Sequence, residues 1–204
     1  MKQPGDGADV VSRETTDRLR QFTDLLLRWN RTINLISRKD ESSVWERHVL
    51  DALQLVPLMP PGVTRAVDLG SGAGFPGLVL AIASEAHFHL IESDQRKSAF
   101  LREAARLTGA SATVHAARIE TVHLPPVALV TARALAPLVD LIGLAQPFLA
   151  ENGMLLAPKG SNVEAELTAA RPQWHMRVER APSTTNPAAT ILQITEVRRV
   201  GNPS

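Results

Sequence analysis

A strand-like run that enters a glycine-rich loop constrains this chain more than any other feature. Between Arg65 and Gly77 the sequence reads RAVDLGSGAGFPG, with an apolar run before the glycines and another, Leu78–Ile82, after them. Glycine has no Cβ and adopts positive φ readily, so the backbone amides of such a loop can approach a ligand closely. A strand, a glycine turn and a helix start in succession predict the ligand loop of an α/β fold that binds a nucleotide-like molecule.

The order of the remaining elements predicts an open sheet. Further strands are expected at His87–Ile91, Thr113–Ala116, Val127–Thr131 and Met154–Ala157. Helical patterns separate them, over residues 77–84, 94–109, 138–149 (with Pro147 near the end) and 161–170, where Ser161 is the expected cap. Two extended runs, Trp174–Glu179 and Thr190–Val197, alternate as an antiparallel pair would. This alternation predicts an α/β fold of the Rossmann-like kind, with a mostly parallel sheet and an antiparallel C-terminal strand pair.

A helical appendage is expected ahead of the sheet. Residues 1 to about 11 have the composition of a frayed tail. After Ser12, a plausible N-cap, apolar residues recur at helical spacing as far as Trp29. The pattern breaks over residues 30–37, and a second helix is expected from Ser42 or Ser43 to Val56. We therefore predict an N-terminal tail and appendage over residues 1–62 and a sheet domain over residues 63–204, which form one compact unit.

The composition excludes several classes of protein. The 204 residues include 22 Lys and Arg against 21 Asp and Glu, which disfavours a strongly basic, non-specific nucleic-acid binder. There is no cysteine, so disulfides, cysteine zinc sites and cysteine nucleophiles are excluded. The six histidines have no recognisable ligand spacing, and we assign no metal. No long apolar run predicts a membrane span and no signal sequence is recognisable, so a cytoplasmic protein is the simplest expectation.

The carboxylates around the loop indicate the class of ligand. Gly72, Gly74 and Gly77 match G-x-G-x-x-G, and Glu92 follows where a carboxylate can accept both ribose hydroxyls. NAD and other adenosyl ligands share this pattern. Asp68, directly before the loop, opposes a pyrophosphate and suits a cation, and no G-x-x-x-x-G-K-[ST] phosphate loop exists. Both points favour S-adenosylmethionine, which carries ammonium and sulfonium groups. A carboxylate that caps the loop is a second, compatible role for Asp68.

Motifs spread along the chain add a family resemblance. They are Trp29-Asn30, Asn34-Leu35, Arg47-His48, Leu50–Leu53, Asp68–Gly77 with its Pro76-Gly77 end, Arg118–Glu120, Arg133–Ala136 and Lys159-Gly160. In this order they resemble the RsmG (GidB) family of class I S-adenosylmethionine-dependent methyltransferases. That family methylates guanine N7 in the decoding-region loop of bacterial 16S rRNA. Ala52, Pro137 and Ile36-Ser37 depart from its common residues, in the appendage and at the site rim.

The resemblance implies a set of cofactor-binding positions and a partner. Together with the residues argued above, the predicted set is Asp68, Gly70, Gly72, Phe75, Glu92, Ile119, Glu120 and Arg133. The implied partner is 16S rRNA or the 30S subunit, and we infer no obligate protein partner. Two alternative functions remain open: a methyltransferase with another acceptor, and a non-catalytic RNA-associated binding module. A nicotinamide oxidoreductase is disfavoured by Asp68.

The residue types fit a reaction that needs no general base. Guanine N7 carries an available lone pair, so positioning and electrostatics suffice for its methylation. We assign no catalytic residue beyond positioning, for which Arg133 and Lys159 are candidates because each can donate to O6 beside N7. A surface cation is the alternative role of both. His48 is expected to be a packing or capping residue.

The candidate RNA-binding residues are cations outside the loop. They are Arg28, Arg38, Lys39, Arg47, Arg96 and Lys97, with Arg31 nearby. Acidic residues are interleaved with them, so a solvated helix face is the alternative interpretation. Aromatic residues are scarce, which favours recognition of structured RNA by shape and phosphate contacts.

Overall fold

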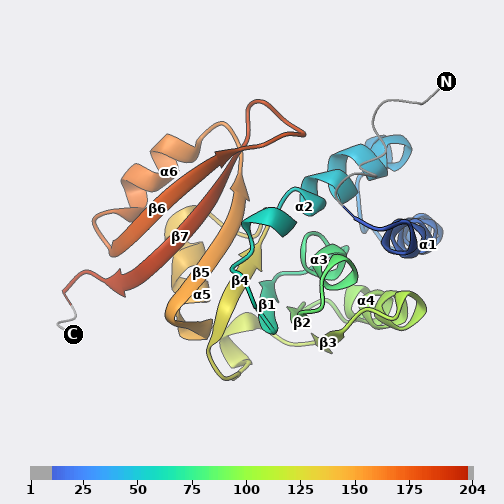
Figure 1. The fold of residues 1–204 in the computed structure, drawn as a ribbon, viewed down its shortest axis with the longest axis horizontal. Coiled ribbons are helices and arrows are strands. Elements are labelled where there is room, and N and C mark those ends of the chain that lie inside the picture. The colour runs from blue at the N-terminus through green and yellow to red at the C-terminus, as the bar shows by residue number, and fades with distance from the viewer. Residues whose placement is uncertain (1–10, 202–204) are drawn as a thin grey trace.

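A seven-stranded sheet forms the centre of the molecule in the computed structural model, which describes residues 11–201 (Figure 1). Its order is β3-β2-β1-β4-β5-β7-β6. The strands are β1 (Arg65–Leu69), β2 (His87–Ile91), β3 (Ala112–His115), β4 (Val127–Ala132), β5 (Leu149–Lys159), β6 (Trp174–Pro182) and β7 (Thr190–Arg199). The first five strands pair in parallel, whereas β7 is antiparallel to both β5 and β6. The predicted fold class is confirmed, including the terminal antiparallel pair.

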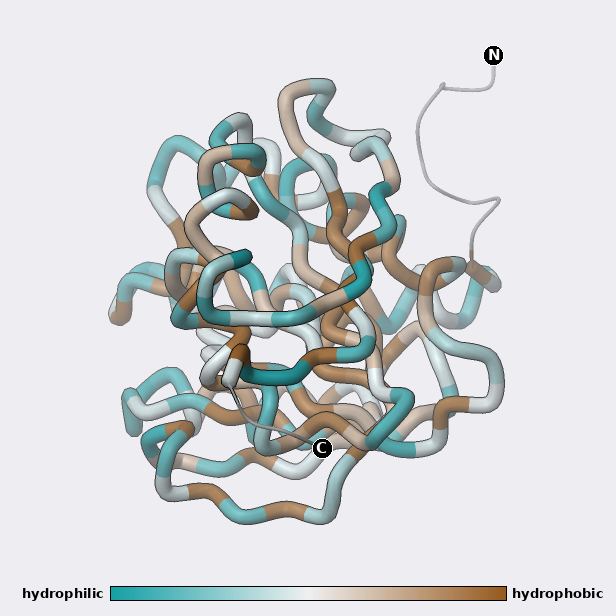
Figure 2. The backbone as a smooth tube through the Cα atoms, turned by 90° about the vertical axis from the view of Figure 1, so that its left-hand side faces the viewer, coloured by the Kyte–Doolittle hydropathy of each residue, from teal (hydrophilic) through white to brown (hydrophobic). Residues whose placement is uncertain are grey.

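Helices cover the two faces of the sheet because its strands alternate apolar side chains between them. On one face, Ala66 and Phe88 join a core cluster with α1 (Arg13–Asn30), α3 (Gly77–Ala83) and α4 (Gln95–Thr108). On the other, Val67 and Val130 pack with α5 (Leu138–Ala145) and α6 (Val163–Ala170). Figure 2 shows the hydrophobic segments concentrated inside the molecule and hydrophilic ones along its outer loops. Because the first five strands are parallel, their carboxyl ends all lie at one edge of the sheet.

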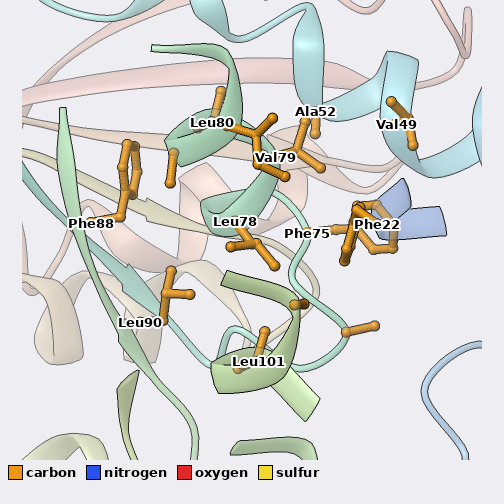
Figure 3. Packing of buried hydrophobic residues seen from close by; sticks show 14 of the residues in the cluster. Phe22, Val49, Ala52, Phe75, Leu78, Val79, Leu80, Phe88, Leu90 and Leu101 are labelled. Atoms are coloured by element: carbon orange, nitrogen blue, oxygen red, sulfur yellow. The ribbon is translucent and has the colours of Figure 1, made fainter. Parts of the chain in front are cut away.

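The N-terminal helices share the core of the sheet domain. The ring of Phe22 in α1 lies 5.3 Å from that of Phe75 and 6.2 Å from that of Phe100. Val49 and Ala52 approach the same cluster from the next helical segment (Figure 3). Residues of the appendage therefore pack against the glycine loop through Phe75. The division at residue 62 stays a prediction. Within residues 11–201, no helix is both long and apolar enough to cross a membrane.

The predicted helix from Ser42 or Ser43 to Val56 is present, with other bounds. The backbone is helical without a break from Arg38 to Leu53: a 3-10 start, η1 (Arg38–Ser43), leads through Val44 into η2 (Trp45–Leu50), a π-helix, and then α2 (Asp51–Leu53). A separate turn, η3 (Val56–Leu58), follows. Local side-chain hydrogen bonds explain the early start. Asn30 Oδ1 accepts from the amides of Leu35 and Ile36, and Ser37 donates to Asp40 over 2.6 Å. These bonds turn the chain at residues 37–40, before either serine can cap a helix.

Three further boundaries differ from the sequence prediction: the end of α5, the start of β5 and the start of α6. The helix that begins at Leu138 ends at Ala145, and a 3-10 turn, η5 (Gln146–Phe148), carries Pro147. Strand β5 then starts five residues before Met154, with a register shift against β4. A Cβ on the buried Gly153 would lie 2.9 Å from the Val127 oxygen, so this glycine allows the bulge rather than a turn. Helix α6 begins at Val163, and Ser161 does not cap it. The predicted N-terminal tail lies almost entirely outside the described residues.

Candidate functional site

The glycine loop leaves β1 at the carboxyl edge of the sheet and is fixed by its own backbone. Gly70, Gly72 and Gly74 all have positive φ, of 64°, 53° and 92°. The amide of Ser71 donates to the Ile91 oxygen at the end of β2 over 3.0 Å, which ties the loop to the neighbouring strand. The loop then opens directly into α3 at the edge of the sheet where the parallel strands end.

Asp68 is a fully buried carboxylate at the head of this loop. Its Oδ1 accepts a hydrogen bond from the Thr131 hydroxyl over 2.6 Å, and its Oδ2 has no hydrogen-bond partner among residues 11–201. Burial raises the pKa of Asp68 to about 6, against the opposing effects of the Thr131 and Ser71 hydroxyls, the Arg133 charge and the Gly77 amide. A Cβ on Gly77 would lie 2.4 Å from the Asp68 Cβ and Cγ. Only glycine fits beside this side chain.

Glu92 links the loop to the start of α4. The carboxylate is 9% exposed; Oε2 accepts from the Gly72 amide over 2.9 Å and Oε1 from the Asp94 amide over 2.7 Å. Each carboxylate oxygen has more than one lone pair, so both can accept a further donor. Glu92 therefore stands at the end of β2 as a pre-positioned acceptor for hydroxyl groups.

Phe75, Ile119 and Glu120, three further predicted cofactor positions, differ in burial and in their contacts. The ring of Phe75 is buried; it stacks on His48 at 5.0 Å and lies under the Arg133 guanidinium at 5.2 Å. Its side chain serves packing, and its backbone belongs to the loop. Ile119 and Glu120 lie on a 3-10 turn, η4 (Ile119–Thr121), after β3, with Ile119 half-buried and Glu120 exposed.

Arg133 ends β4 and is held by the N-terminal appendage. Its guanidinium donates to Asp51 Oδ2 over 3.0 Å and to His48 Nδ1 over 3.2 Å. Burial and then the Arg133 charge lower the pKa of His48, which suits a neutral imidazole that accepts from Arg133. Asp51 and His48 belong to a motif quoted from the sequence, but nothing in the sequence assigned them this contact. They are 82 and 85 residues away from Arg133 along the chain.

Lys159 ends β5 beside a cavity of about 1100 Å³. The cavity is lined by residues that include Arg133, Leu135, Lys159, Asn162, Glu166 and Asn186. Among the described residues, its lining includes none from 68 to 77, so it adjoins the glycine loop without containing it. Leu135 adjoins both: it lines the cavity, and a Cβ on Gly70 would lie 2.6 Å from its Cδ1.

The candidate RNA-binding cations lie on α1, η1, η2 and the start of α4. Helices α1 and α4 are neighbours (Figure 1). Arg18, near the start of α1, donates to the oxygen of Thr108 at the end of α4, and Trp29, near the end of α1, packs 5.8 Å from Phe100 of α4, so the two helices run antiparallel. Arg28 at the end of α1 is therefore brought toward the start of α4, where Arg96 and Lys97 lie. Arg38 and Lys39 are exposed on η1. Two of the six predicted cations are in ion pairs with acids: Arg47 with Asp40 and Arg96 with Asp94.

The sheet order, the glycine loop and the strand-end carboxylates together define the class I S-adenosylmethionine-dependent methyltransferase fold. Solved structures of this class are similar. Cofactor-bound Rv0187 from MTB matches with a TM-score of 0.62 and 13% identity, over 97% of this chain and 100% of that chain. A SAM dependent methyltransferase from Aquifex aeolicus matches with a TM-score of 0.58 and 14% identity, over 78% of this chain and 94% of that chain.

Sequence comparison narrows the class to one family. The GidB family, described as rRNA small subunit methyltransferase G, matches residues 15–192. Ribosomal RNA small subunit methyltransferase G of Granulibacter bethesdensis is 54% identical over 190 residues, which cover 93% of this chain and 89% of the relative. The chain therefore belongs to the GidB family, as its motifs predicted.

Proposed function

We propose that this protein transfers a methyl group from S-adenosylmethionine to N7 of a guanine in the decoding-region loop of bacterial 16S rRNA. The assignment of the cofactor rests on the fully buried Asp68, whose Oδ2 lacks a hydrogen-bond partner among the described residues. Membership of the GidB family supports the class of acceptor. The nucleotide within that acceptor follows from the resemblance of the motifs.

The residues present fit S-adenosylmethionine. A buried carboxylate at the head of the loop, with one oxygen that has no hydrogen-bond partner among the described residues, favours a cationic ligand and opposes a pyrophosphate. Gly70 and Gly72 supply close backbone approach, Glu92 supplies acceptors for ribose hydroxyls, and Ile119 and Glu120 lie beyond the end of β3. When bound, this cofactor supplies an electrophilic sulfonium methyl group. The chain orients the ligand and holds negative charge beside it.

The cavity next to Arg133 fits the acceptor side of the reaction. Its volume of about 1100 Å³ is ample for a nucleotide. Arg133 has five N–H donors, and Asp51 and His48 accept two of them. A remaining donor can meet guanine O6, which orients N7 toward the glycine loop. Because N7 needs no deprotonation, Arg133 acts as a positioning group and the reaction needs no base from the chain.

Calorimetry tests the proposed cofactor, and transfer of a labelled methyl group tests the proposed acceptor. We expect S-adenosylmethionine to bind with far greater affinity than NAD, and a labelled methyl group to reach 16S rRNA, as naked RNA or in 30S subunits. Tight NAD binding without S-adenosylmethionine binding would contradict the cofactor. RNA association without label transfer from either substrate would favour the binding module, and transfer to a non-ribosomal acceptor alone would favour another methyltransferase.

Glu92→Ala is expected to weaken cofactor binding about 10- to 100-fold, because hydrogen bonds to a charged group contribute about 1.5–3 kcal/mol each. Isothermal calorimetry measures this change. Glu85→Ala is the matched control, because Glu85 is an exposed acid after α3. Glu92 also holds Gly72 and Asp94, so thermal unfolding is recorded for both variants. Equal cofactor affinity in the wild type and Glu92→Ala would remove Glu92 from the site.

Arg38→Ala is expected to weaken RNA binding and to reduce the slope of log K against log salt by about 0.9, the value for one lost phosphate contact on a duplex. Cofactor affinity should not change. Arg106→Ala is the matched control, because Arg106 is exposed at the opposite end of α4 from Arg96. Filter binding at several salt concentrations measures both. An unchanged salt slope would show that Arg38 is a solvated cation.

A further inference from the structure

The loop between β4 and α5, residues 133–138, lies beside both the glycine loop and the cavity. Leu135 at its centre contacts Gly70 on one side and lines the cavity on the other. Ala134 has a φ of 53°, in the left-handed region that non-glycine residues rarely occupy. Such a conformation persists only where surrounding contacts hold it. The contacts at the two ends of this loop therefore determine where Leu135 lies.

Both ends of the loop are tied to other parts of the chain. At the start, Arg133 is held by Asp51 of the appendage over 3.0 Å. At the end, Lys159 Nζ donates to the Ala136 oxygen over 3.0 Å and to Glu166 Oε2 over 2.7 Å. The same Glu166 oxygen accepts from the Leu138 amide over 2.7 Å. Lys159 and Glu166 thus contact the last residues of the loop by one hydrogen bond each and contact each other.

We propose that Lys159 and Glu166 form a positioning clamp for the β4–α5 loop, which keeps Leu135 against Gly70 beside the cofactor. The proposal rests on the proposed function and changes one residue role within it. Lys159 is assigned to the loop rather than to guanine O6. Glu166, which sequence reasoning did not select, becomes its partner.

Burial and charge favour the clamp over an RNA contact. The Lys159 side chain is 10% exposed, and the carboxylate of Glu166 neutralises its charge at 2.7 Å. A phosphate or base would have to displace the carboxylate or the Ala136 oxygen. Arg133, whose side chain is 20% exposed, keeps more donors available to a ligand. The acceptor is therefore oriented by Arg133, while Lys159 and Glu166 fix the segment that carries Arg133.

The two interpretations predict opposite effects of neutralising Glu166. If Lys159 contacts RNA, Glu166→Gln frees a cation, and RNA affinity rises. If the pair is a clamp, Glu166→Gln loosens the loop as Lys159→Met does, and RNA affinity does not rise. RNA affinity in the double variant should be no lower than in either single variant, because each single substitution already breaks the Lys159–Glu166 pair. Glu164→Gln is the matched control: Glu164 lies on the same helix and pairs with Arg180 outside the loop.

Hydrogen exchange in the free protein tests the clamp independently of any ligand. We expect the amides of Ala134, Leu135, Ala136 and Leu138 to exchange about tenfold faster in Lys159→Met and in Glu166→Gln than in the wild type or Glu164→Gln. Exchange in β1 and α4 should not change. Unchanged exchange at 134–138 in both variants would overturn the clamp, whether or not the wild type methylates RNA.

Cofactor and RNA binding complete the test. Both variants should weaken S-adenosylmethionine binding about tenfold while the salt slope of RNA binding stays that of the wild type. Wild-type cofactor affinity in both variants would overturn the proposal. A salt slope lowered by about 0.9 in Lys159→Met, with tighter RNA binding in Glu166→Gln, would overturn it in favour of an RNA contact. Failure of the wild type to methylate rRNA would instead contradict the proposed function and leave the exchange result to decide the clamp.

Discussion

Gly77→Ala is expected to abolish measurable cofactor binding and to lower the free energy of unfolding by about 3 kcal/mol, the upper part of the range for overpacked sites. The added Cβ would lie 2.4 Å from the Asp68 Cβ and Cγ and 2.5 Å from its Oδ2. Asp68 cannot move aside easily, because it is fully buried and bound to Thr131 over 2.6 Å. The clash can be relieved only if the Asp68 carboxylate or the start of α3 moves, and either movement changes the shape of the glycine loop.

Gly160→Ala is the control for this substitution. A Cβ on Gly160 would meet no atom within 4 Å, and its backbone has no positive φ. We expect wild-type stability and cofactor affinity from this variant. Denaturant unfolding and calorimetry measure both quantities. A Gly77→Ala protein with the stability and cofactor affinity of Gly160→Ala would show that the contact with Asp68 does not constrain the loop.

The second large effect is a dependence of stability and cofactor affinity on the protonation of Asp68. Its pKa is raised from 3.8 to about 6 by burial, so the folded state binds more protons than the unfolded state between these values. The free energy of unfolding therefore falls, by about 3 kcal/mol from this group, as the pH rises from about 4 to about 6. A cationic ligand favours the ionised carboxylate. Affinity for S-adenosylmethionine should accordingly rise through pH 6 and level off above it.

Asp68→Asn tests this assignment with a side chain of the same shape. We expect the variant to lose both pH dependences near pH 6 and to bind S-adenosylmethionine about tenfold more weakly at pH 8, because a neutral amide does not attract the cation. Calorimetry from pH 5 to pH 8 gives the affinities, and urea unfolding gives the stabilities. Identical pH profiles for Asp68→Asn and the wild type would assign the titration to another group.

The glycine loop and the elements around it were predictable because their signals are local. The bounds of β2 and the positions of β1 and α3 follow from short apolar runs and glycine spacing, and these predictions are confirmed. The sheet direction followed from the alternation of strands and helices. Asp68 and Glu92 stand at strand ends, where any ligand of a parallel sheet must lie. Their roles toward the cofactor stay predictions.

The contacts that position the site were not predictable, because they join residues far apart in the chain. The partners of Arg133 lie in the appendage, and no sequence pattern connects Asp51 with a strand end 82 residues away. Thr131 and Glu166 gave no signal at all, since a threonine in a strand and a glutamate on a helix are ordinary. The helix expected from Ser42 or Ser43 starts earlier for a local reason: the side chain of Asn30 turns the chain before the serines.

The most direct test is the chemical identity of the methylated position. Labelled S-adenosylmethionine is supplied with naked 16S rRNA and with 30S subunits from a strain that lacks the modification. Borohydride and aniline treatment then cleaves the RNA at N7-methylguanine. The account predicts label at a single guanine of the decoding-region loop and cleavage at that guanine, in at least one of the two substrates. Label that resists cleavage, label elsewhere in the RNA, or no label in either substrate would contradict it.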